Sequence, residues 1–154
     1  MFDLAEKRLV WISVTWPGLA SEGDKLAEPV EHKAEFQVEL VDIDQFQFLF
    51  VSPIAEDGTK HLWATDEAFA AWSKGEVNDR YRARELTSDW RGIASNRVKV
   101  PYSPDAMNAL MGKPNFSKAY FQAYMEAWNA IAETRAGNSE GSPETGSTGE
   151  PQPS

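Results

Sequence analysis

The sequence predicts an α+β fold, with an N-terminal antiparallel β-hairpin or small sheet followed by a C-terminal bundle of about four helices. Two segments before residue 42 alternate apolar and polar residues with the period of a strand, whereas segments after residue 65 carry helix-start signals and helical spacing. The 154 residues fit one domain. We assign residues 1–135 to this domain and residues 136–154 to a disordered tail.

Two strands are predicted near the N-terminus. Residues 8–16 place Val10, Ile12, Val14 and Trp16 on one face at period two, and Pro17-Gly18 closes the segment. Residues 32–41 repeat the pattern, with Ala34, Phe36, Val38 and Leu40 alternating with Glu35, Gln37 and Glu39. An apolar face opposite a polar face is typical of an antiparallel strand with one buried side. We therefore expect the two strands to pair across a loop at 19–31.

Residues 42–52 fit two structures. Asp42 followed by Gln45 resembles the start of a helix, and the apolar residues that follow fit helical spacing. Three phenylalanines in this range also alternate as they would in a strand, and a turn at Asp57-Gly58 would then close a hairpin with His61–Trp63. The local pattern leaves both structures open.

Helical signals begin at Thr65. This residue is a suitable cap for a first helix, which Gly75 interrupts. A second helical stretch is predicted over residues 76–90, and a loop is predicted at Asp89–Ile93. The chain between residues 65 and 93 is therefore expected to hold two short helices and a turn.

Two further helices are predicted before the tail. Ser103 as cap, Pro104 at the first helical position and Asp105 in the first turn form a strong helix start. That helix is short and stops at Gly112, since glycine is favoured just past a helix end. The last helix is predicted over residues 115–135.

The last predicted helix is strongly apolar. Its stripe consists of Phe116, Tyr120, Ala123, Tyr124, Ala127 and Ile131, widened by Phe121, Met125 and Trp128. One neighbour does not cover so much apolar surface, so the helix is either central to the core or meets a partner. An ordinary core explains most of the stripe. We predict that Phe121, Met125 and Trp128 form a rim that contacts a partner or another copy, with Tyr120 and Tyr124 as further candidates.

The tail and the net charge limit the classes of partner. Residues 136–154 contain no aromatic or branched aliphatic residue and are predicted to be disordered. The net charge is −9, and three glutamates of the tail account for part of it, which leaves the domain near −6 by subtraction. An acidic surface repels phosphates, so no nucleic acid is expected as a partner. We also expect no secretory signal and no membrane span.

No catalytic, cofactor-binding or metal-binding residue is predicted, and we expect a protein that is not an enzyme. Cysteine is absent, which excludes disulfides and thiolate chemistry. His32 and His61 lack metal-ligand spacing and are interpreted as solvated side chains. Neighbouring acids such as Asp42 and Asp44 suit helix starts. The sequence has neither a Gly-x-Ser-x-Gly elbow nor a glycine-rich loop placed to hold a phosphate.

One basic cluster stands out against this acidity. Arg80, Arg82 and Arg84 lie close together with a tyrosine among them, a combination that can indicate nucleic-acid binding. Because the chain as a whole is acidic, we interpret the cluster as a solvated helix face or as ion pairs with Asp79 and Glu85.

Three segments of the C-terminal half together resemble a known family. They are Ser88-Asp89-Trp90-Arg91-Gly92-Ile93, the stretch from Val100-Pro101-Tyr102-Ser103-Pro104-Asp105 to Met111, and Ala119–Ala127. A Trp-x-Gly-Ile turn, a Pro-Tyr-Ser helix start and an aromatic Ala-Tyr helix in this order are similar to the tail assembly chaperones of long-tailed phages and prophages, encoded beside the tape measure protein. The resemblance covers 90–135 well and 8–50 loosely, and region 52–75 has no counterpart in the family pattern.

The resemblance implies a helix at 42–50 and a holdase function. Such a chaperone binds the tape measure protein through exposed apolar and aromatic helical surface, without ATP, and keeps it soluble until the tail tube polymerises. The binding mode would be a helix in a groove. Further implied partners are the tail tube protein and other copies of the chain. The protein would act in the host cytoplasm and be absent from the mature virion, and the family often makes a longer frameshifted form.

The resemblance also assigns roles to its signature residues. Trp90, Gly92, Tyr102, Ser103 and Pro104 look architectural, since they would set a turn and start a helix without forming the binding surface. A structural minor tail protein retained in the virion is the alternative function. A small enzyme of an unrecognised type is a third.

Overall fold

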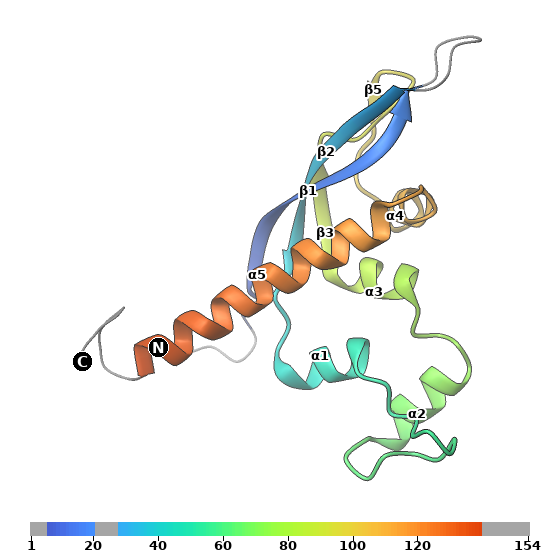
Figure 1. The fold of residues 1–154 in the computed structure, drawn as a ribbon, viewed down its shortest axis with the longest axis vertical. Helices are drawn as coiled ribbons and strands as arrows, with labels where there is room; N and C mark the ends of the chain where they lie inside the picture. Colours follow the sequence, from blue (N-terminus) through green and yellow to red (C-terminus); the bar gives the residue numbers. More distant parts are fainter. Residues whose placement is uncertain (1–5, 21–27, 140–154) are drawn as a thin grey trace.

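The computed structural model describes residues 6–20 and 28–139 and confirms the α+β fold class (Figure 1). The antiparallel sheet has the strand order β1-β2-β3, with β1 at Leu9–Ala20, β2 at Glu28–Glu39 and β3 at Thr87–Arg91. A separate hairpin joins β4, Ala94–Ser95, to β5, Val98–Lys99. The helices are α1 at Ile43–Phe50, α2 at Asp66–Ser73, α3 at Asp79–Leu86, α4 at Pro104–Met111 and α5 at Phe116–Ser139.

The β1–β2 hairpin is longer than the sequence predicted. Pro17-Gly18 does not close the first strand, and residues 19–31 are not all loop, because the strand pairing continues to the end of β1. The Leu40 N–H donates to the Arg8 carbonyl at 2.8 Å, so even-numbered β1 residues bond to β2 and odd-numbered ones face the open edge. Pro17 is odd-numbered, and its missing N–H therefore costs no ladder bond. The part of the predicted loop at 21–27 lies outside the described residues.

The third strand was predicted as the end of a helix and a loop. The helix is shorter than the predicted 76–90, and Thr87–Arg91 instead pairs with β2, with Trp90 opposite Phe36. The free side of β2 offers ladder bonds that a local pattern cannot reveal. Gly92 follows at φ 91°, a left-handed backbone angle that favours glycine.

The helical alternative at 42–52 is the one observed. Asp42 caps α1, with its carboxylate accepting from the Gln45 N–H at 3.0 Å. The turn at Asp57-Gly58 forms, but among the described residues it closes only the isolated bridge between Ile54 and Lys60. The phenylalanines of α1 therefore belong to a helix that packs against α5.

Two other helix starts follow the sequence signals. The Thr65 hydroxyl accepts from the Ala68 N–H at 3.1 Å, and the Ser103 hydroxyl accepts from the Ala106 N–H at 3.1 Å. The last helix extends to Ser139, beyond the predicted end of the domain at residue 135. The remainder of the predicted disordered tail, 140–154, lies outside the described residues.

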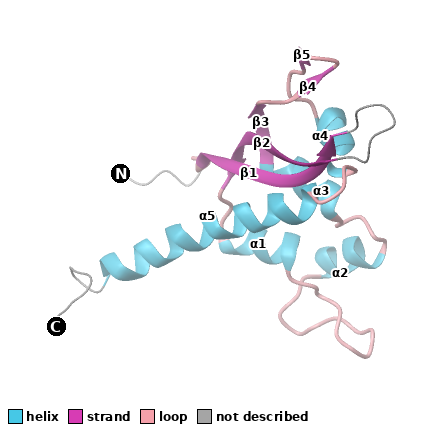
Figure 2. Cartoon of the chain, turned by 45° about the horizontal axis from the view of Figure 1, so that its top comes forward, coloured by secondary structure: helices cyan, strands magenta, loops and turns pink. Residues whose placement is uncertain are grey.

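The core lies between the inner face of the sheet and α5, which runs along that face (Figures 1 and 2). Phe36 is at its centre and is fully buried. Its ring centroid lies 5.5 Å from that of Phe116, 5.7 Å from that of Tyr120 and 6.2 Å from that of Trp90. One side chain of the central strand thus joins the sheet to α5.

Replacing the Phe36 ring should strongly destabilise the chain. Phe36→Ala should lower the free energy of unfolding by about 3–5 kcal/mol, because it removes a fully buried ring from among three other rings. Urea unfolding gives the measurement. Lys33→Ala, an exposed position on the same strand, is the control and should change stability by less than about 0.5 kcal/mol. Similar losses in both variants would contradict the central position of Phe36.

Candidate partner-binding surface

The structure divides the apolar stripe of α5 into buried and partly exposed members. Tyr120 and Tyr124 are completely buried, so their assignment as partner-binding residues is wrong. Tyr120 shares a 2.6 Å hydrogen bond with the Thr87 hydroxyl. The Tyr124 hydroxyl donates to the Glu39 carbonyl at 2.8 Å and accepts from the Val41 N–H at 3.3 Å. Both rings therefore tie α5 to the sheet and to the chain that follows β2.

Burial also changes the acidity of both tyrosines. Loss of hydration raises the pKa of Tyr124 to about 12, partly offset by its hydrogen bond with the Val41 backbone. The same loss raises the pKa of Tyr120, and its bond to Thr87 opposes the shift. Both phenols are therefore neutral around pH 7 and serve as hydrogen-bonding groups within the fold.

The predicted rim of α5 forms one surface with α1, which we call the α1–α5 aromatic face. Its members are Phe46, Phe50, Phe121, Met125 and Trp128, all partly buried. Phe46 stacks on Trp128 with 4.3 Å between ring centroids, and Phe50 meets Phe121 edge-on at 5.9 Å. The structure thus adds two α1 residues, which the sequence did not assign to the surface. Their helical spacing on α1 was the available signal.

Trp128 is anchored more firmly than a rim residue needs to be. Besides stacking on Phe46, its Nε1–H donates to the Val41 carbonyl at 2.9 Å. Truncating it would therefore disturb α1 as well as the surface. Phe121 likewise packs edge-on against Tyr120 at 5.1 Å. The exposed parts of this face, and not its anchors, are the better probes of binding.

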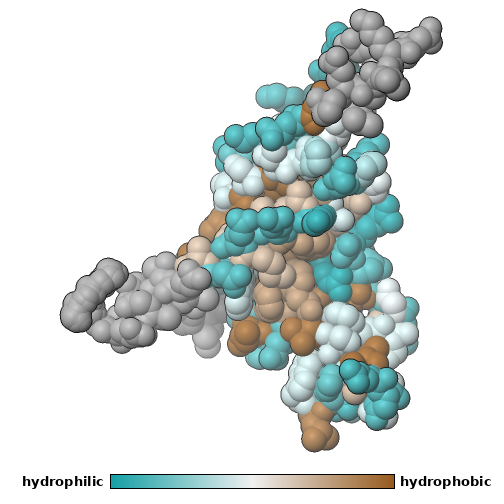
Figure 3. All heavy atoms as spheres, viewed as in Figure 1, coloured by the Kyte–Doolittle hydropathy of each residue, from teal (hydrophilic) through white to brown (hydrophobic). Residues whose placement is uncertain are grey.

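Two more exposed apolar residues border the aromatic face. Ile43 is 57% exposed and Val51 is 38% exposed, at the two ends of α1. Figure 3 shows apolar residues gathered over α1 and between α1 and α5, below a row of hydrophilic residues along α5. Asp42 and Asp44 are exposed on either side of Ile43 in the sequence. The surface is therefore apolar in the centre with carboxylates beside it.

A second apolar feature lies in the loop before α2, which the sequence did not assign. Leu62 is completely exposed, and Trp63 is half exposed and stacks on His61 at 5.6 Å. The loop is held by the Lys60 ammonium, which donates to the Ala64 carbonyl at 2.8 Å. Tryptophan is enriched among the anchor residues of protein interfaces, so the exposed Trp63 on this held loop is a second candidate contact.

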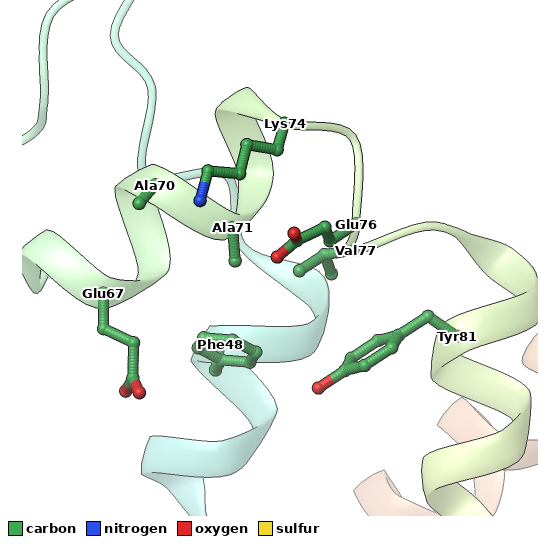
Figure 4. A pocket seen from close by; sticks show the side chains of 8 residues that line it. All are labelled: Phe48, Glu67, Ala70, Ala71, Lys74, Glu76, Val77 and Tyr81. Carbon is green, nitrogen blue, oxygen red and sulfur yellow. The ribbon is translucent and has the colours of Figure 1, made fainter.

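A hollow of about 320 Å³ lies between α1, α2 and α3 (Figure 4). Phe48 and Tyr81 line it, with the Tyr81 hydroxyl directed toward Phe48. Loss of hydration and the nearby Glu85 carboxylate raise the pKa of Tyr81. Glu67 and Lys74 also line the hollow. A mixture of apolar and charged walls suits a side chain of a partner better than it suits chemistry on a small substrate.

The residues that carry the sequence resemblance lie at a strand end, a ring pair and a helix start. The Trp90 Nε1–H donates to the Val100 carbonyl at 2.7 Å, and its ring meets Tyr102 edge-on at 5.2 Å. This pair spans the β4–β5 hairpin and fixes the approach to α4. Ser103 and Pro104 then start α4 as cap and first residue. Gly92 provides the positive φ that ends β3.

The arginine cluster joins elements of the fold. Arg82 pairs with Asp79 at 3.0 Å and also donates to the Leu49 carbonyl of α1. Arg80 and Arg84 both donate to Asn108 of α4. Arg80 donates to the main-chain carbonyl of Asn108, and Arg84 donates to its side-chain oxygen. The predicted pair with Asp79 is therefore confirmed, and these contacts hold α3 against α1 and α4.

Neither histidine lies in a group of metal-ligating side chains, and within residues 6–20 and 28–139 no cluster suited to a metal ion was found. In the same ranges, none of the helices is both long enough and apolar enough to cross a membrane. Comparisons of the chain with family models, curated proteins and solved structures give no match.

Removing one hydroxyl should show how α5 is held. Tyr124→Phe should lower the free energy of unfolding by about 1–3 kcal/mol, because it deprives the Val41 N–H and the Glu39 carbonyl of a buried partner. Urea unfolding at neutral pH measures the loss. Tyr81→Phe is the control, since no hydrogen bond of its hydroxyl is found among the described residues. A loss no larger than that of the control would contradict the role given to Tyr124.

Stability should fall at alkaline pH through the same group. The pKa of Tyr124 is about 12 in the folded chain and about 10 in an unfolded one, so the folded chain holds the proton more tightly. Its contribution is complete below pH 10 and is lost as pH rises from about 10 to about 12. Urea midpoints from about pH 8 to about pH 11 should decline less steeply in Tyr124→Phe than in the wild type. Equal slopes would contradict the shift.

Proposed function

We propose that this chain is a tail assembly chaperone of a long-tailed phage or prophage, which binds the tape measure protein and keeps it soluble until the tail tube polymerises. It would do so without ATP and without chemistry on a substrate, in the host cytoplasm, and would be absent from the finished virion. The tail tube protein would be a second partner at the moment of release. The order of the Trp90–Ile93, Tyr102–Asp105 and Ala119–Ala127 segments supports the family assignment.

The observation that carries the proposal is the α1–α5 aromatic face. Its aromatic side chains are only partly covered by the chain itself, and exposed Ile43 and Val51 extend the apolar area at both ends of α1. An amphipathic helix of a partner could lay its apolar stripe along such a face. The tape measure protein is long and helical, so it offers this stripe many times.

The charges beside the face favour a partner with basic residues along its apolar stripe. Asp42 and Asp44 flank the exposed Ile43 at the start of α1. Lysine or arginine on the rim of a partner helix would meet these carboxylates and steer the encounter. Such rim pairs add specificity and association rate more than affinity, which suits a complex that must come apart.

Release is built into the partial burial of the face. Because α5 and α1 already cover much of each ring, a partner helix can bury only the part of the ring surface that is still exposed. The apolar area buried per bound copy is therefore small. Binding at one site should therefore be weak, and many copies along one tape measure chain would hold it together. A polymerising tube that encloses the tape measure protein could then displace the copies one by one.

Two experiments test the proposal. Coexpression with the proposed partner, a tape measure protein, should keep that protein in the soluble fraction, and omission of this chain should leave the tape measure protein aggregated. Mass spectrometry of purified virions should find no stoichiometric amount of this chain. Its presence in virions at fixed copy number would instead favour a structural minor tail protein, the alternative function.

A single exposed residue should separate binding from folding. Ile43→Ser removes an exposed apolar side chain from the aromatic face, so unfolding should change by less than about 0.5 kcal/mol while tape measure solubilisation falls several-fold. Val98→Ser is the matched control, because Val98 is 67% exposed on the β4–β5 hairpin, far from α1 (Figure 1). Equal solubilisation by both variants would place the binding surface elsewhere, and Leu62→Ser would then test the loop before α2.

A further inference from the structure

The open edge of β1 lacks the charged residues that usually protect an exposed strand. β1 is an edge strand of 12 residues, LVWISVTWPGLA, and none of them is charged. Natural proteins normally protect such an edge with lysine, other charges or short length, because its free N–H and carbonyl groups invite another strand. Leu9 is 46% exposed and Trp11 is 37% exposed on the outer face beside this edge. Pro17 protects only the far end of this edge, so the stretch from Leu9 to Thr15 is open to pairing with another strand.

The register defines which backbone groups are available. Even-numbered residues bond to β2, so Leu9, Trp11, Ser13 and Thr15 turn their N–H and carbonyl groups to the open side. Within the described part of the chain, no backbone or side-chain hydrogen bond reaches these edge-facing groups. The next edge-facing residue, Pro17, has no N–H, and its carbonyl accepts from the Asn115 side chain at 3.4 Å. The free edge therefore ends at Thr15.

We infer that the partner of this edge is β1 of a second copy, paired antiparallel about a two-fold axis at Ile12. In this register Leu9 lies opposite Thr15 of the second copy, and Trp11 lies opposite Ser13. Every free edge group of one copy then meets a free edge group of the other, which is the self-complementarity that a two-fold interface requires. The two three-stranded sheets become one continuous sheet.

The side chains agree with this pairing on both faces. On the inner face Ile12 meets itself, and Val10 meets Val14, so apolar residues are opposite apolar residues. On the outer face Trp11 lies diagonal to Trp11 of the second copy. Within one copy, the Arg91 guanidinium stacks on the Trp11 ring at 3.6 Å. Since no residue between 9 and 15 is charged, the pairing places no like charges opposite each other.

The helix beneath β1 carries small side chains on one flank. α5 packs against β1, so pairing through this edge brings the two α5 helices toward each other. The flank of α5 opposite Phe121, Met125 and Trp128 carries Ala119, Ala123 and Ala127, all partly exposed. Small side chains on this flank permit close approach. The α1–α5 aromatic face remains on the other side, so the inference does not depend on the proposed function.

Sedimentation or light scattering of the purified chain should give the mass of two copies at micromolar concentration. Ser13→Pro removes the edge-facing N–H at the centre of the pairing without removing a β1–β2 bond, and should raise the dimer dissociation constant by about tenfold or more. Ser13→Thr keeps the strand and the N–H and should remain dimeric. Ser13→Lys places like charges near the axis and serves as a second disruptive variant if the proline variant fails to fold.

Disulfide cross-linking tests the register. The chain has no cysteine of its own, so Leu9→Cys with Thr15→Cys should give an intermolecular disulfide under mild oxidation. The two positions are about 20 Å apart within one strand, which excludes an internal bond. Each single variant should stay uncross-linked. The inference is overturned by a wild type that stays monomeric, including one that binds an extended peptide of another protein at this edge, or by a dimer that survives both Ser13→Pro and Ser13→Lys.

Discussion

The fold depends on the attachment of α5 to the sheet through buried tyrosines. The rings of Tyr120 and Tyr124 lie under β2. The Tyr120 hydroxyl hydrogen-bonds to Thr87, and the Tyr124 hydroxyl hydrogen-bonds to the backbone at Glu39 and Val41. These bonds fix the end of β2, the start of β3 and the approach to α1 with one helix. A buried phenol without such partners would be costly, so the helix position and the strand ends determine each other.

The same attachment decides which side chains remain for binding. With its tyrosine row buried, α5 presents Phe121, Met125 and Trp128 on one flank, and α1 comes over them with Phe46 and Phe50. Full coverage would have added stability and removed the surface, whereas full exposure would have left an aggregation-prone patch. Partial coverage leaves a limited apolar area exposed, and a partner that binds this area does so weakly and reversibly.

The sequence predicted the fold class and most helix starts because those signals are local. Ser103-Pro104 and Thr65 act through residues three positions away. The sequence did not predict β3 because its residues pair with β2 residues, such as Phe36, that lie more than fifty positions away. Pro17 was wrongly predicted to end the first strand, because its place on the open edge is visible only once the sheet has formed. For the candidate surface, helical period found the stripe of α5. It could not separate Tyr124 from Trp128, since only packing decides which flank of a stripe is buried.

The open edge of β1 and the α1–α5 aromatic face are separate surfaces of the chain. A dimer joined through β1 leaves both α1–α5 aromatic faces open, so one assembly would hold two binding faces with fixed geometry. Two weak sites on one rigid body bind a repetitive partner far more tightly than one site does, provided that the spacing of the partner's apolar stripes matches. A partner with many equivalent helical stripes satisfies that condition over a wide range of spacings. Edge pairing would thus supply avidity, and the partial burial of each face would keep every single contact breakable.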